Sequence, residues 1–164
     1  MSSISGFIQR EIKQKKPFTS LETEALVGIV IVADVLRRAC ASVVEQGGVT
    51  SHQQYNVLRI LRGAGAKGLP VREIAARLVE KAPGITRFID QLESRGLITR
   101  RRSTSDRRQV FCRITSSGLK LLRRLDKPVE EWEKKSMSML TRGKLKQLLI
   151  CLGKIHSFHR KAKG

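Results

Sequence analysis

A strand–turn–strand pattern in the second half of the chain constrains its fold more than any other feature. Two runs, 97–103 and 110–115, flank the polar turn TSDRRQ. In the second run Val110, Cys112 and Ile114 alternate with their neighbours, as in a half-buried strand. Gly96, just before the first run, is typical of the residue that ends a helix. The pattern predicts a helix followed at once by a two-stranded hairpin with a basic tip.

Three short helices are predicted ahead of the hairpin. The first covers about 50–62 and the second about 71–78. The third begins at Pro83, because proline is favoured at the first helical position. The second and third are separated only by a short turn. We therefore expect a mainly α chain with a small β wing, in which residues 50–115 form a winged helix-turn-helix.

Longer helices are predicted on both sides of this unit. Residues 19–48 show apolar side chains at helical spacing, and length and caps favour a helix over the strand that their β-branched run could indicate. Thr19 and Thr50 each open a capping pattern, T-x-x-E and T-x-x-Q. Residues 116–164 are predicted to be helical, with Pro128 kinking or breaking the first helix.

The apolar faces of the terminal helices lie outside the central unit, so they need a covering surface. A second copy of the chain is the natural cover, which makes 19–48 and 116–164 expected dimerisation helices. Residues 1–18 are polar and basic, and we expect a loose arm there.

The net charge of +19 favours nucleic acid or an anionic membrane over a generic soluble role. Residues 81–124 alone hold twelve basic and three acidic side chains, which places a charge of +9 on one small unit. Three scattered cysteines without a C-x-x-C pair indicate a reducing cytoplasm. No apolar stretch approaches the roughly 20 residues that span a membrane, so no membrane partner is expected.

Candidate DNA contacts gather on the third helix and at the hairpin turn. Thr86, Arg87, Asp90 and Gln91 share the outward face of the helix, and the first two are early enough to reach bases. Lys81, Pro83 and Gly84 leave the helix N-terminus open to a phosphate. In the turn, the Asp106 carboxylate can hold the Arg108 guanidinium in one orientation.

The stretch LPVREIAARLVEKAPGITRFIDQLESRGLITRRRSTSDRRQVFCRITSSGLKLL resembles the MarR family of bacterial transcription regulators. Its Asp106-Arg107-Arg108 turn, followed by Ile114-Thr115 and Gly118, is similar to the wing signature of that family. ITRFIDQLESRGLITR is similar to the recognition helix and the following strand. The resemblance implies major-groove contacts from the start of the third helix and insertion of Arg108 into the minor groove. The complete set of expected DNA-binding residues is Lys81, Pro83, Gly84, Thr86, Arg87, Gln91, Arg101, Asp106, Arg107 and Arg108.

Members of the family are typically homodimers that repress transcription and release DNA when a small molecule or an oxidant acts. The resemblance thus implies a sequence-specific transcription regulator in the cytoplasm, associated with the bacterial nucleoid. A symmetric dimer predicts a pseudo-palindromic site whose half-sites lie roughly 10 bp apart. A small aromatic or phenolic effector is the expected ligand. Two alternatives remain open: a non-specific or architectural nucleic-acid binder, and a protein-interaction module. No catalytic constellation is visible, so neither enzyme activity nor a cofactor is expected.

Other reactive residues carry weaker signals. Cys40 lies on an apolar stripe, where it is either a thiol sensor or, more commonly, a small buried hydrophobe. Cys151, His156 and His159 do not have a convincing spacing for metal ligands. Residues 134–163 contain nine Lys or Arg and no acid, which fits a solvated face, an extra phosphate contact or a membrane-surface helix.

Overall fold

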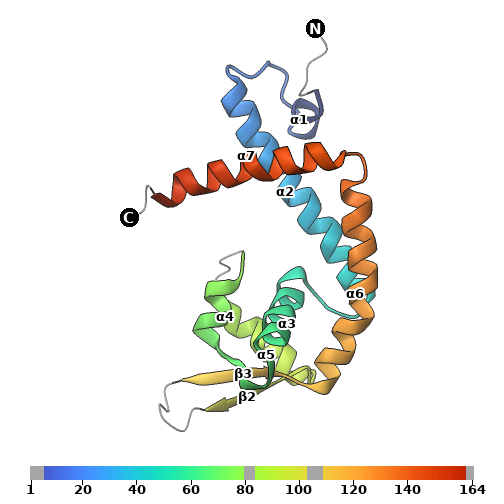
Figure 1. Ribbon diagram of the computed structural model, residues 1–164, viewed down its shortest axis with the longest axis vertical. Helices are drawn as coiled ribbons and strands as arrows, with labels where there is room; N and C mark the ends of the chain where they lie inside the picture. The colour runs from blue at the N-terminus through green and yellow to red at the C-terminus, as the bar shows by residue number, and fades with distance from the viewer. Residues whose placement is uncertain (1–5, 80–83, 103–108, 162–164) are drawn as a thin grey trace. The chain divides into compact units, whose positions relative to one another are not determined.

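The computed structural model describes residues 6–79, 84–102 and 109–161, and the chain divides into two compact units, Met1–Leu125 and Asp126–Gly164. The fold is mainly α-helical with a small antiparallel sheet, as the sequence predicts (Figure 1). Within the described residues, no helix is both long and apolar enough to cross a membrane. The elements are α1 (Gly6–Glu11), α2 (Leu21–Gln46), α3 (His52–Ala64), η1 (Gly65–Lys67), β1 (Leu69–Pro70), α4 (Val71–Arg77), α5 (Ile85–Ser94), β2 (Ile98–Arg102), β3 (Val110–Ile114), α6 (Ser116–Met137) and α7 (Arg142–Lys161).

The sheet holds the predicted hairpin and one strand that the sequence did not indicate. β2 and β3 pair antiparallel, with Ile98 opposite Ile114. The short β1 pairs with the other edge of β3, so the order is β1-β3-β2. Two residues are too few to show an alternating pattern, and Pro70 is tolerated because β1 is an edge strand.

The first unit is built around α3, whose apolar face is fully buried. Helices α4 and α5 and the sheet pack around it, which is the arrangement that holds α5 in place. The core is aliphatic, as expected from an aromatic content of 4%. Its fully buried members include Val57, Leu58, Leu61, Ile74, Ile89, Leu92, Ile98, Cys112 and Leu122.

Both predicted capping patterns are displaced by one residue. The caps are Ser20 and Ser51, whose hydroxyl oxygens each accept from the backbone N–H three residues later at 3.2 Å. The prediction of Thr19 and Thr50 as helix N-caps is therefore wrong. In each case two hydroxyl residues adjoin, and either can cap in principle. The Thr50 hydroxyl instead donates to Oε1 of Gln54 at 2.6 Å.

The expected loose arm is wrong for residues 6–11, which form α1. Ile8 is only 4% exposed because it packs against α2 at Gly28. A Cβ added to Gly28 would lie 3.0 Å from Cδ1 of Ile8. The absence of a side chain at Gly28 thus lets an apolar residue of α1 dock on α2.

Pro128 does not break the helix that contains it. α6 runs through this position from Ser116 to Met137. Proline removes one amide donor, so the carbonyl of Arg124 loses its helical partner. Pro128 is exposed, and water can therefore hydrate that carbonyl, which lowers the cost of continuing the helix. The last helix, predicted over 141–160, is α7.

Candidate nucleic-acid interface

α5 presents one apolar and one polar face. Ile89 and Leu92 are fully buried, whereas Thr86, Arg87 and Asp90 are exposed, as the helical spacing predicts. Ile89 and Leu92 are three residues apart and share one side of the helix, so the exposed side chains point away from the core. The exposed face of α5 is thus free to meet a ligand.

The start of α5 is shaped by a glycine. Gly84 has a φ of +105°, which side chains rarely tolerate, and no side chain caps the helix within the described residues. The first turn contains no acidic residue. The positive end of the helix dipole is therefore available to an anion. The sequence predicts a helix start at Pro83, whereas α5 begins at Ile85. Two of the expected contacts, Lys81 and Pro83, lie outside the described residues.

Gln91 faces protein, which corrects its expected outward position. Its Oε1 accepts from Nε2 of Gln54 at 2.8 Å, and the side chain is half-buried. Gln54 on α3 is 1% exposed and also receives the hydroxyl of Thr50. A buried amide is costly unless its donors and acceptors are paired. The chain Thr50–Gln54–Gln91 therefore fixes α5 against α3.

Arg100 on β2 joins the hairpin to α5, a relationship that the sequence analysis missed. Its Nη1 lies 2.7 Å from Oδ1 of Asp90, and its Nε donates to Oε2 of Glu93 at 2.6 Å. The backbone N–H of Arg100 donates to Oε1 of the same glutamate at 3.1 Å. These hydrogen bonds hold the pKa of Glu93 below its ordinary value, although partial burial acts in the opposite direction.

The neighbouring arginines of β2 are placed differently. Arg101 and Arg102 are exposed and lie opposite Phe111 and Val110 in the register. They bring positive charge to the strand that leads to the hairpin turn. The turn itself, with Asp106, Arg107 and Arg108, lies outside the described residues.

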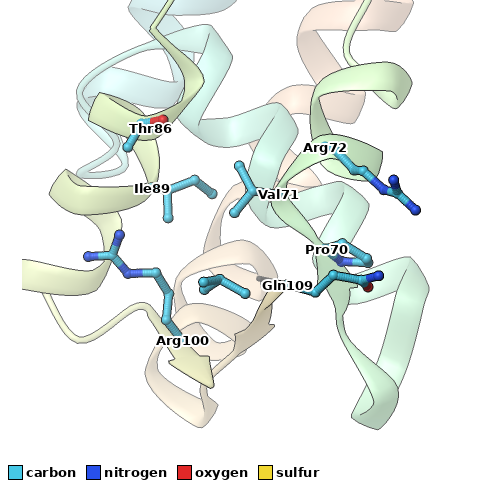
Figure 2. Close-up of a pocket in the computed structure, with 8 residues that line it drawn as sticks. Pro70, Val71, Arg72, Thr86, Ile89, Arg100 and Gln109 are labelled. Atoms are coloured by element: carbon cyan, nitrogen blue, oxygen red, sulfur yellow. The ribbon is translucent and has the colours of Figure 1, made fainter. Parts of the chain in front are cut away.

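A pocket of about 320 Å³ separates α5 from the start of α4 and from the base of the hairpin. Figure 2 shows Thr86 and Ile89 on one side of it, Val71 and Pro70 on the other, and Arg100 at its edge. The pocket combines apolar walls with two guanidinium groups, one hydroxyl group and one side-chain amide. Its lining residues are Pro70, Val71, Arg72, Thr86, Ile89, Arg100, Gln109 and Val110.

The cysteines differ in environment. Cys112 is fully buried in β3, and this burial raises the pKa of its thiol to about 11. Cys40 is 5% exposed, as expected for a small core residue, while Cys151 is exposed. A thiol with a raised pKa forms little of the reactive thiolate, so Cys112 has a packing role.

This chain is similar to known proteins in both sequence and fold. The MarR family model matches residues 50–110. The HTH-type transcriptional regulator FarR of Neisseria gonorrhoeae is 28% identical over 142 residues, which cover 85% of this chain and 95% of FarR. The HTH-type transcriptional regulator YpoP of Bacillus subtilis is 33% identical over 105 residues, covering 64% of this chain and 73% of YpoP.

Solved structures agree with these matches. A MarR transcription factor from Planctomyces limnophilus has a TM-score of 0.64 and 35% identity, covering 84% of this chain and 98% of that one. The S. aureus MepR–DNA complex has the same fold, with a TM-score of 0.72 and 23% identity over 86% of this chain and 98% of that one. The described fold, the exposed face of α5 and these matches agree that the chain belongs to the MarR family of winged helix-turn-helix transcription regulators.

Proposed function

We propose that this protein, a sequence-specific DNA-binding regulator by family, is a homodimeric repressor that reads a pseudo-palindromic operator with α5 and the β2–β3 hairpin. The observation that carries the proposal is the Arg100–Glu93 link. It joins the reading helix to the hairpin, so that both approach one duplex as a single unit. Preorganised contacts bind more tightly because less conformational freedom is lost on association.

The two parts of this interface have different tasks. Thr86 and Arg87, on the exposed start of α5, contact base edges in the major groove, and Gly84 admits a phosphate at the helix N-terminus. Arg101, on β2, contacts the phosphate backbone of the DNA. By the family resemblance, Lys81 and Pro83 belong to the first surface, and Asp106, Arg107 and Arg108 to the second, where Arg108 enters the minor groove.

The dimer is supported by apolar side chains that a folded monomer would leave in water. On α2 these include Leu26, Val30 and Val35, which are 58%, 69% and 45% exposed. Exposed patches of this kind mark interaction surfaces, and a second copy of the chain would cover them symmetrically. α7 presents a further set: Leu148, Leu149, Ile150, Leu152, Ile155 and Phe158.

A small aromatic or phenolic effector fits the pocket of Figure 2. Its apolar walls would receive a ring, and a phenolate or carboxylate would compete with Asp90 and Glu93 for Arg100. Weakening that link would loosen α5 relative to the hairpin and favour release of DNA. A cytoplasmic site of action, with the nucleoid, follows from the proposed operator binding.

Selection of binding sites from random duplex DNA at physiological salt tests the proposal. Enrichment of an inverted repeat with half-sites about 10 bp apart is the expected result. Tight binding without enrichment would favour the non-specific alternative, driven by the charge of +19. Failure to bind any duplex at low salt would favour a protein-interaction role. Repeating the selection with phenolic compounds tests the effector.

A further inference from the structure

A second pocket, of about 360 Å³, lies at the far end of α5 from the reading surface. Arg95 directly follows α5 and stands ten residues after Ile85, about 15 Å along a helix. The pocket is bounded by the α2–α3 turn, the α5–β2 turn and the start of α6, all within the first unit. Its lining residues are Gly48, Arg95, Leu97, Ser117, Lys120, Leu121 and Arg124.

The charged residues that line this pocket are all cationic. They are Arg95, Lys120 and Arg124, and the lining contains no carboxylate. Within the described part of the chain, neither Lys120 nor Arg124 forms an ion pair. Like charges gathered around one concavity repel each other, and an anion placed between them removes that repulsion.

Two features prepare the pocket for an anion. Arg95 is held in place because its Nη2 donates to the carbonyl oxygen of Gly48. α6 begins at the pocket, and its N-terminus is ordered by Thr115, whose Oγ1 accepts from the N–H of Gly118 at 3.1 Å. The positive end of the α6 dipole therefore adds to the three side-chain charges.

The floor of the pocket is apolar. Leu97 and Leu121 are 7% and 5% exposed, and both line it. A DNA backbone is contacted by exposed basic side chains and gains little from a buried leucine floor. A pocket of about 360 Å³ that combines basic and apolar lining residues has room for a small anionic molecule.

We propose that this pocket binds a small organic dianion, such as a phosphate monoester, with its anionic group between Arg95, Lys120 and Arg124 and its apolar body on Leu97 and Leu121. Bound there, it would tie the end of α5 to the start of α6 and so bias the orientation of the reading helix. Only this regulatory consequence rests on the proposed function, because binding to the pocket does not require DNA.

Titration calorimetry of the full chain with phenyl phosphate tests the proposal. We expect saturable binding that is at least tenfold weaker in the K120Q/R124Q double variant. R123Q/K127Q is the matched control, because it removes two charges from exposed positions of the same helix that do not line the pocket. Its affinity should stay within twofold of wild type. Inorganic phosphate should bind more weakly than phenyl phosphate, and uncharged benzyl alcohol should not bind.

Equal affinity of K120Q/R124Q and wild type for phenyl phosphate, or no saturation by wild type, would overturn the proposal. The proposal would also be overturned if wild type did not bind phenyl phosphate and K120Q/R124Q bound duplex DNA more weakly than wild type. Lys120 and Arg124 would then be DNA contacts. If the protein binds phenyl phosphate but enriches no operator sequence, the anion site is supported and the proposed function is wrong.

Discussion

Glu93 near the end of α5 and Arg100 on β2 are joined through both side chain and backbone. The arginine donates its Nε–H to Oε2 at 2.6 Å and its backbone N–H to Oε1 at 3.1 Å. Both side chains are about one-third exposed, at 35% and 33%. The link therefore has a modest effect on stability, and its main consequence is geometric: the hairpin keeps a defined position relative to α5.

This link predicts a pH dependence of stability. The pKa of Glu93 is lowered from its ordinary value of 4.5, chiefly by the hydrogen bond from Arg100. The folded state therefore takes up this proton less readily than the unfolded state. The stabilisation is present above pH 4.5 and is lost as the pH falls through the lowered pKa. Urea midpoints should fall less with acidification in Glu93→Gln than in wild type, whereas Glu22→Gln, on α2, should follow wild type. Parallel profiles for all three proteins would refute the link.

Arg87 should carry base discrimination. Its side chain is exposed near the start of α5, so Arg87→Ala should remove about 1–3 kcal/mol of binding to the selected operator and relax its base preference. Fluorescence anisotropy with the operator and a scrambled duplex measures both effects. Arg142→Ala, at the start of α7, removes the same charge elsewhere and should change both affinities little. Unchanged discrimination in Arg87→Ala would mean that the wrong face of α5 was assigned.

The Gln54–Gln91 hydrogen bond should stabilise the fold measurably. Gln54 is 1% exposed, so Gln54→Leu breaks the bonds to Thr50 and Gln91 and leaves their groups without a buried partner. We expect a loss of about 1–3 kcal/mol in the free energy of unfolding. The Q54L/Q91L double variant should lose less than the sum of the single losses, by more than about 0.5 kcal/mol, as for residues in contact. Strict additivity in urea denaturation would show that the pair is not coupled.

Gly118 should not accept a side chain. A Cβ at this position would lie 2.3 Å from the carbonyl oxygen of Leu97 and 2.7 Å from Cγ1 of Ile114. The carbonyl is fixed, because it also accepts from the N–H of Thr115 at 3.0 Å. Gly118→Ala should therefore cost about 1–3 kcal/mol of unfolding free energy. Gly143→Ala on α7 meets nothing within 4 Å and should be neutral or stabilising, by up to about 1 kcal/mol. Thermal unfolding of both variants distinguishes crowding from a general effect of alanine.

The apolar face of α2 should hold two copies together. Val30 is 69% exposed in the single chain, and Val30→Glu would place a carboxylate in the proposed interface. Sedimentation equilibrium should show at least tenfold weaker self-association. Val79→Glu is the control, because Val79 is 92% exposed and lies after α4, beside residues of α3. A monomeric wild type, or equal dissociation constants for the two variants, would exclude this face from the interface.

The parts of the fold that local patterns encode were predictable. Alternation located the hairpin within a residue or two, and helical spacing separated the buried Ile89 and Leu92 from the exposed Arg87. The helix end at Gly96 was also predicted, and its φ of +65° gives the reason for the glycine. Each of these signals depends on residues only a few positions apart.

Contacts between distant residues were not predictable. Gln91 was expected on the outward face because the helical period alone places it there, and its partner Gln54 is 37 residues earlier. Arg100 was one of several arginines in the basic run, and only the turn that brings β2 beside α5 singles it out. The capping residues Ser20 and Ser51 were not predictable, because each adjoins a threonine that could also cap. Only the backbone conformation decides which hydroxyl reaches the first helical N–H groups.

The sequence alone therefore determined the order of helices and strands, the basic character of the central unit and the face of α5 that meets solvent, because periodicity and charge are local properties. The tertiary structure decided which polar residues remain available to DNA. The half-buried Gln91 is paired with the buried Gln54, since a buried polar group needs a partner within the protein. Arg100 stays at the surface but is bound to Glu93, whereas Thr86 and Arg87 are exposed. The tertiary structure also placed Arg95 at the same pocket as Lys120 and Arg124, whose i,i+4 spacing on α6 puts only those two on one face.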